Sequence, residues 1–115
     1  MKIDTLKVLV DHDGTTITKP GVSEPMTIGY VCMQALNIND SAGIEEKIRR
    51  DIQAEEIYKC NGAYEISRRD IKKLRELIGG FSPRVARQMS DYFSEVENQP
   101  DEPKSKDKEL KAVGE

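Results

Sequence analysis

Apolar residues recur at helical spacing in four stretches of this chain, separated by short runs rich in glycine, proline, serine and asparagine. In the first stretch Thr27 suits a helix N-cap, because its hydroxyl can accept a bond from a free backbone N–H. One face of the following segment is apolar: Ile28, Val31, Cys32, Ala35 and Leu36. The pattern predicts an amphipathic helix over residues 27–36.

The second stretch predicts a longer helix, with Ser41 as its N-cap and its end near Lys59. Asn61 and Gly62 follow, and both residue types accept the left-handed conformation that ends many helices. The expected core face is Ile44, Ile48, Ile52 and Ile57. The expected solvent face is Glu45, Glu46, Arg49, Arg50, Glu55 and Glu56.

Two further helices are predicted between residues 67 and 97. Ser67 and Asp70 form a variant of the capping box, and Gly79-Gly80 ends the helix that they begin. Ser82-Pro83 starts the next helix, since proline at the first helical position loses no hydrogen bond. The apolar positions are Ile71, Leu74, Leu77 and Ile78 in the first helix, and Val85, Met89, Tyr92, Phe93 and Val96 in the second.

The N-terminal region has short β-prone runs on both sides of residues 11–14, Asp-His-Asp-Gly. Aspartate and glycine tolerate the positive φ of a tight turn, so a β-hairpin is expected there. A short extended piece at residues 64–66 is in position to pair with it. The predicted fold class is α+β and mostly helical, with an N-terminal β-hairpin packed on about four helices.

The composition changes at Asn98, after which no apolar residue occurs before Leu110. A segment this polar cannot bury enough surface to offset the entropy of ordering it. We therefore expect one compact domain over residues 1–97 and a disordered charged tail over residues 98–115.

Charge and cysteine content narrow the function classes. The chain has 18 basic and 21 acidic residues, a net charge of −3, and no apolar run long enough for a membrane span. Without a signal-like N-terminus, Cys32 and Cys60 are expected to be reduced thiols in a cytosol. Two distant cysteines and one histidine cannot form a Cys/His zinc site, and neither a cofactor nor a metal is indicated.

The densest basic zone is the candidate interaction surface. Its members are Arg68, Arg69, Lys72, Lys73, Arg75, Arg84 and Arg87. An acidic protein partner or a nucleic acid would explain such a zone, and an ordinary solvated face would also explain it.

Helices flanking Gly79-Gly80 are similar to a helix-turn-helix. Arg84, Arg87 and Gln88 would then lie early on a recognition helix, where side chains contact phosphates and base edges. Arg75 stands where such motifs have alanine, and Gly80 replaces an apolar residue. An αα-corner with basic surface residues is the alternative that we favour.

The segment over residues 8–16 resembles the first motif of the haloacid-dehalogenase-type phosphatases, an apolar strand followed by Asp-x-Asp-Gly-Thr. That resemblance implies Asp11 as nucleophile and Asp13 as acid/base, with magnesium between carboxylate and phosphate. The rest of the chain is predicted to be helical, without the later parallel strands that such an enzyme needs. Calcium loops fail as well, because neither Gly14 nor Gly62 has the ligands required around it.

The order of features over residues 13–95 resembles a group of small proteins encoded by tailed bacteriophages and prophages. The pattern comprises Asp13-Gly14, Met26-Thr27, Ala35-Leu36, Glu45-Glu46-Lys47, Glu65-Ile66-Ser67, Asp70-Ile71, Pro83 and Gln88. This group has no assigned activity, so the resemblance implies a source and no catalytic residues.

The leading hypothesis is a small non-enzymatic accessory protein in the cytoplasm of a bacterial host, acting by docking on a protein partner. A DNA-binding regulator is the alternative, and a phosphatase at Asp11 and Asp13 comes third. The identity of the partner and the oligomeric state stay open.

Overall fold

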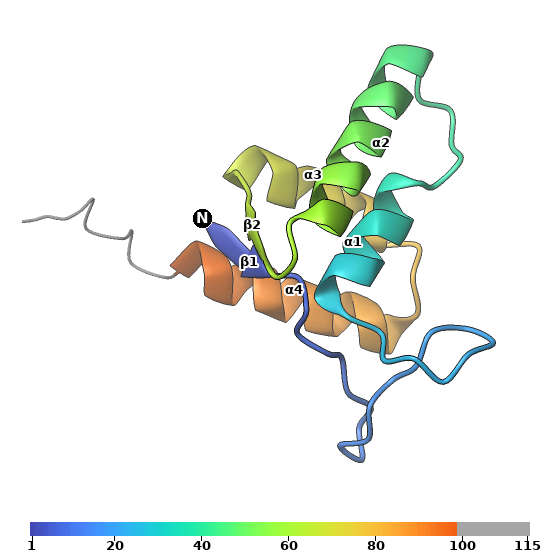
Figure 1. Ribbon diagram of the computed structural model, residues 1–115, viewed down its shortest axis with the longest axis vertical. Helices are drawn as coiled ribbons and strands as arrows, with labels where there is room; N and C mark the ends of the chain where they lie inside the picture. Colours follow the sequence, from blue (N-terminus) through green and yellow to red (C-terminus); the bar gives the residue numbers. More distant parts are fainter. Residues whose placement is uncertain (99–115) are drawn as a thin grey trace, which may run out of the picture.

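The computed structural model describes residues 1–98 as two short strands and four helices (Figure 1). The elements in chain order are β1 (Lys2–Asp4), α1 (Ile28–Leu36), α2 (Ile44–Lys59), β2 (Ala63–Glu65), α3 (Arg68–Ile78) and α4 (Pro83–Asn98). The fold is α+β and mostly helical, as predicted. Of the tail expected over residues 98–115, Asn98 is the last residue of α4, and residues 99–115 lie outside the described part.

Helix α1 is the central element, packing against both α2 and α3 (Figure 1). All five residues of its predicted apolar face are buried, and Thr27 caps it by accepting a hydrogen bond from the Tyr30 N–H at 3.1 Å. Cys32 is a free thiol within this face, and burial raises its pKa to about 12. It therefore acts as a small core hydrophobe, as its position in the helix predicted.

The two strands pair antiparallel, with Ile3 opposite Tyr64, so the extended piece predicted at residues 64–66 does join the N-terminal β-structure. The predicted turn at residues 11–14 is also present. Gly14 adopts a φ of +87°, the Asp11 N–H donates to the Thr15 carbonyl at 2.7 Å, and an isolated bridge joins Val10 and Thr16. The regular two-stranded sheet thus links segments about sixty residues apart, while the local turn is held by single bridges.

Thr5 is the junction between the N-terminal segment, α1 and the turn after α2. Its N–H donates to the Gly62 carbonyl and its carbonyl accepts from the Gly29 N–H, both at 2.9 Å. A Cβ on Gly29 would lie 2.8 Å from Thr5 Cβ and 2.9 Å from Thr5 O, closer than real Cβ contacts. Only glycine fits at position 29, because the two backbones meet directly.

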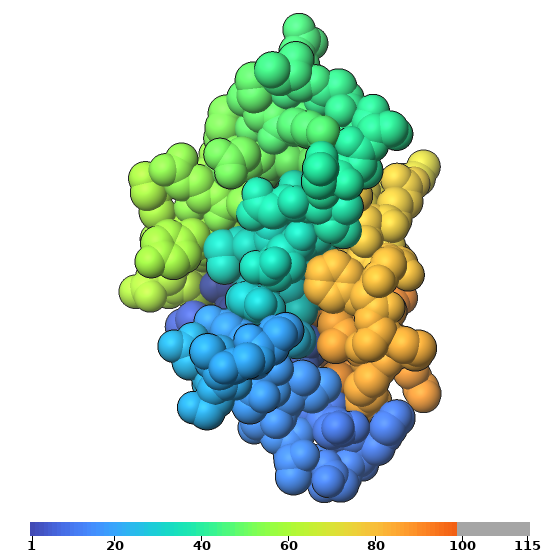
Figure 2. All heavy atoms as spheres, turned by 90° about the vertical axis from the view of Figure 1, so that its right-hand side faces the viewer, coloured from blue at the N-terminus to red at the C-terminus, as the bar shows by residue number. Residues whose placement is uncertain are grey.

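The structure corrects the expected core face of α2. Ile44, Ile48 and Ile52 are 74%, 52% and 51% exposed, whereas Ile57 is 3% exposed. Each residue turns the helix by about 100°, so Ile57, thirteen residues after Ile44, lies on nearly the opposite side. The side that packs on the core comprises Arg50, Ala54 and Ile57. The first turns of α2 extend beyond the other helices (Figure 1 and Figure 2).

The start and the solvent face of α2 also differ from the prediction. The N-cap is Gly43 and not Ser41, and Asp40 instead accepts the Ala42 N–H at 3.0 Å. Arg50, expected in solvent, is buried because its guanidinium pairs with Asp40 at 3.0 Å and Glu46 at 3.2 Å. A buried cation needs such partners. The Ala42 N–H, followed by Arg50, holds the pKa of the Asp40 carboxyl below its usual range.

We predict that Gly29→Ala lowers the free energy of unfolding by about 1–3 kcal/mol, the usual cost of an overpacked site. The added methyl group meets Thr5 backbone as well as side chain, which leaves it no space. Urea denaturation measures the change. The matched control is Gly80→Ala, whose Cβ meets one carbonyl at an ordinary 3.9 Å and should cost less than about 0.5 kcal/mol. Equal stability of the two variants would contradict this account of Gly29.

We predict that Ile57→Ala lowers the free energy of unfolding by about 2–5 kcal/mol, since it empties a packed site. The same substitution at Ile48, on the exposed side of α2, should cost less than about 1 kcal/mol. Denaturation of both variants at low protein concentration compares them. A larger cost at Ile48 than at Ile57 would mean that α2 is turned the other way.

Candidate interaction surface

The orientation of α3 decides which predicted cations face solvent. Its capping box is formed: the Asp70 N–H donates to Ser67 Oγ at 3.1 Å, and the Ser67 N–H donates to the Asp70 carboxylate at 3.4 Å. Three apolar side chains, Ile71, Leu74 and Ile78, are buried on one side. Four of the seven predicted surface residues lie on the other side, which we call the α3 basic face: Arg68, Arg69, Lys72 and Lys73.

Members of the α3 basic face differ in how far the fold uses them. Arg69 and Lys72 are exposed and form no hydrogen bond or ion pair with any residue from 1 to 98. Arg68 donates to the Glu97 carbonyl on α4 at 3.2 Å. Lys73 Nζ lies 2.7 Å from Glu46 Oε2 on α2. Two cations are therefore free for an acidic partner, and two also join helices.

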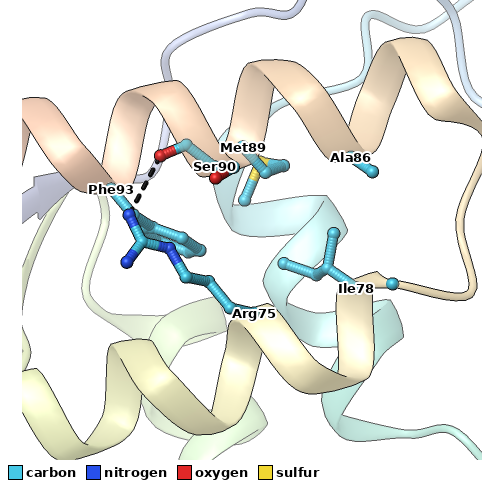
Figure 3. A pocket seen from close by; sticks show the side chains of 7 residues that line it. Arg75, Ile78, Ala86, Met89, Ser90 and Phe93 are labelled. Atoms are coloured by element: carbon cyan, nitrogen blue, oxygen red, sulfur yellow. Dashed lines mark hydrogen bonds between the residues drawn. The ribbon is translucent and has the colours of Figure 1, made fainter.

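Arg75 lies between α3 and α4 and holds the two helices together. Its guanidinium contacts Ser94 Oγ at 2.8 Å and Glu97 Oε1 at 3.2 Å. It also contacts the Ser90 carbonyl at 3.1 Å and stacks over Phe93 (Figure 3). Its Nε is buried with no hydrogen-bond partner among residues 1–98. Arg75 stands at the position where a helix-turn-helix has alanine. A hollow of about 190 Å³ lies beside it.

Arg84 and Gln88 bind the N-terminal segment instead of facing solvent. Gln88 Nε2 donates to the Val10 carbonyl at 2.8 Å, and the Val10 N–H donates back to Gln88 Oε1 at 3.0 Å. Arg84 Nε donates to the same carbonyl at 3.0 Å. These contacts fix the turn at residues 11–14 against α4. No sequence signal could have found them, because more than seventy residues separate the partners. Arg87 is exposed, with Asp91 at 3.8 Å.

Glu46 is the acidic centre between α2 and α3, although its sequence position suggested a solvated side chain. Its carboxylate receives Lys73 at 2.7 Å, Arg49 at 2.9 Å and Arg50 at 3.2 Å, and its side chain is only 19% exposed. The Lys73 hydrogen bond, followed by that of Arg49, lowers the pKa of Glu46 to about 2. The α3 basic face is therefore anchored to α2 through one carboxylate.

The phosphatase-like segment forms a self-contained turn. Asp13 Oδ1 accepts both the N–H and the hydroxyl of Thr15, at 3.0 and 2.7 Å, and these bonds lower the pKa of Asp13. Asp11 Oδ1 accepts the His12 N–H at 2.7 Å. Across residues 1–98 no three His, Cys, Asp or Glu side chains gather in a way that could hold a metal ion. The structure thus uses these carboxylates to shape the turn.

Comparisons of the chain with protein-family models, with curated protein sequences and with solved structures find no match. None of the four described helices combines the length and the apolar character that a membrane crossing requires.

We predict that Glu46→Gln destabilises the protein at neutral pH more than Glu45→Gln, its exposed neighbour on α2. The pKa of Glu46 is about 2 in the folded protein against an ordinary 4.5, so the ionised carboxylate favours folding above about pH 4.5. This contribution disappears as the pH falls from about 4.5 toward 2. Thermal melting across this pH range should show the difference between wild type and Glu46→Gln shrinking toward zero. A difference independent of pH would contradict the ion-pair explanation.

Proposed function

We propose that this chain is a small non-enzymatic accessory protein that docks through the α3 basic face onto an acidic surface of a protein partner. The single observation that carries the proposal is the pair Arg69 and Lys72, which no residue from 1 to 98 neutralises. In keeping with the phage and prophage proteins that the sequence resembles, we propose that it acts in the cytoplasm of a bacterial host.

Rigidity of the α3 basic face favours docking on a preformed surface. The capping box fixes the start of α3, and Lys73 and Arg68 tie its two long edges to Glu46 and Glu97. A partner therefore meets Arg69 and Lys72 on a helix whose position is set in advance, and little ordering is needed at that moment. Opposite charge then speeds encounter and selects the partner.

Three hollows lined by described residues are smaller than the pockets that usually hold a small substrate, which favours protein docking. Their volumes are about 180, 190 and 280 Å³. Pockets that enclose a small-molecule ligand are usually about 300–1,000 Å³.

The contacts of α4 favour a protein partner over DNA. Two of the three side chains expected to contact DNA from this helix, Arg84 and Gln88, already bind the Val10 backbone. Breaking those contacts would release the N-terminal segment, and a base edge would have to replace both hydrogen bonds of Gln88.

The proposal predicts that the double variant Arg69→Glu/Lys72→Glu loses at least tenfold in affinity for its partner while keeping the wild-type melting temperature. The two introduced glutamates would repel the acidic surface of the partner across the contact. Tagged wild type and variant are used for capture from bacterial host extract, and the recovered protein is then titrated against both. A recovered protein that binds wild type and double variant equally would overturn the proposal.

The matched control is Lys7→Glu/Lys59→Glu, which changes the net charge equally at exposed lysines away from α3 and should keep the partner. A second arm measures duplex DNA binding at low and at physiological salt. If the wild type binds duplex DNA with a steep salt dependence and the α3 double variant loses this binding, the partner is a nucleic acid and not a protein.

A further inference from the structure

The exposed side of α2 carries a row of apolar side chains that the core does not use. Ile44, Ile48 and Ile52 are four residues apart, and each is at least half exposed. Together they form one ridge, which we call the isoleucine ridge, on the side opposite Ala54 and Ile57. The ridge begins in the first turns of α2, which extend beyond the other helices (Figure 1 and Figure 2).

Solvation alone does not explain this ridge. Isoleucine is a weaker helix former than the glutamate, lysine and arginine around it, and it gains nothing from water. Contiguous exposed apolar patches rimmed by polar residues mark contact sites more often than scattered apolar side chains do. Ridges of residues four apart pack into the matching grooves of another helix, which is the commonest way in which two helices cross.

We propose that the isoleucine ridge is the contact between two copies of this chain, with their α2 helices antiparallel about a two-fold axis at Ile48. That axis places the two Ile48 side chains together and sets Ile44 of each copy against Ile52 of the other. A two-fold contact requires a patch that is complementary to itself. The even spacing of the three isoleucines about Ile48 meets that requirement.

Charges beside the ridge are complementary in the same arrangement. Seen down the helix axis, Glu45 and Arg49 lie along one long edge of the ridge. Lys47 and Asp51 lie along the other long edge. The two-fold axis at Ile48 brings each edge against the same edge of the second copy, running in the opposite direction. Glu45 of one copy then lies within one helical turn of Arg49 of the other, and Lys47 lies similarly near Asp51. Parallel helices about a two-fold axis would instead set the Glu45 and Arg49 edge against the Lys47 and Asp51 edge.

Interface size sets the expected strength. A contact made by three isoleucines and the side chains beside them is smaller than most specific protein interfaces, which bury about 1,200–2,000 Å² in total. The dimer should therefore dissociate on dilution. This inference does not depend on the docking function proposed above, which uses α3 and not α2.

Sedimentation of the full chain tests the proposal across about 10 to 500 µM at physiological salt. The wild-type mass should rise from 13.0 kDa toward twice that value and stop there. Ile48→Glu should stay at the monomer mass throughout, with an unchanged circular dichroism spectrum, because two charges would meet on the axis. The matched control Val22→Glu changes an exposed apolar residue outside α2 and should dimerise like wild type.

A charge exchange tests the antiparallel register. The single variant Arg49→Glu should shift dimerisation to at least several-fold higher concentration, and Glu45→Arg/Arg49→Glu should restore it.

A wild type that stays at 13.0 kDa up to about 500 µM, or an Ile48→Glu variant that dimerises normally, would overturn the proposal. Open-ended growth beyond the dimer, loss of dimer in Val22→Glu, or failure of the charge exchange to rescue it would also overturn it. If the wild type stays monomeric and loses a bound host protein when Ile48 is replaced, the ridge contacts that protein and not a second copy of the chain.

Discussion

The direct contact between Gly29 and Thr5 is the constraint on which the rest of the structure depends. It presses the start of α1 against the N-terminal segment so closely that no side chain fits between them. Thr5 also binds Gly62, and its hydroxyl lies 3.7 Å from Cys60 Sγ, so the turn after α2 is tied to the same point. Glycine in a helix costs about 1 kcal/mol in propensity. Here that cost is offset by bringing β1, α1 and β2 together at one residue.

Ion pairs hold the helices to one another around this centre. Glu46 joins α2 to α3 through Lys73, Arg50 joins α2 to Asp40 in the preceding loop, and Arg75 joins α3 to α4 through Glu97. Each pair is partly withdrawn from water, where screening is weaker than on an open surface. The basic zone that stands out in the sequence is therefore divided. Part of it assembles the fold, and the remainder on α3 is the surface that we propose for docking.

Within residues 1–98 the α3 basic face is charged and the isoleucine ridge on α2 is apolar, and both are exposed. We propose an acidic partner for the first and a second copy of the chain for the second. The two faces belong to different helices, so the two proposed associations can be tested by separate substitutions. A self-associating protein with a charged docking face would present that face twice, which raises avidity for a partner that carries repeated acidic sites.

The sequence by itself determined the local structure, because capping and periodicity act over only a few residues. Thr27 and the Ser67–Asp70 capping box begin α1 and α3, Asn61-Gly62 ends α2, and the apolar faces of α1, α3 and α4 follow from spacing. Tertiary structure alone decided which side of α2 faces the core, because both sides carry apolar residues. Ile44, Ile48 and Ile52 lie on the exposed side, and Ala54 and Ile57 lie on the buried side. It also decided which cations are free. Whether Arg75, Arg84 or Lys73 meets a carboxylate or a carbonyl depends on residues brought close only by folding, and no local pattern carries that information.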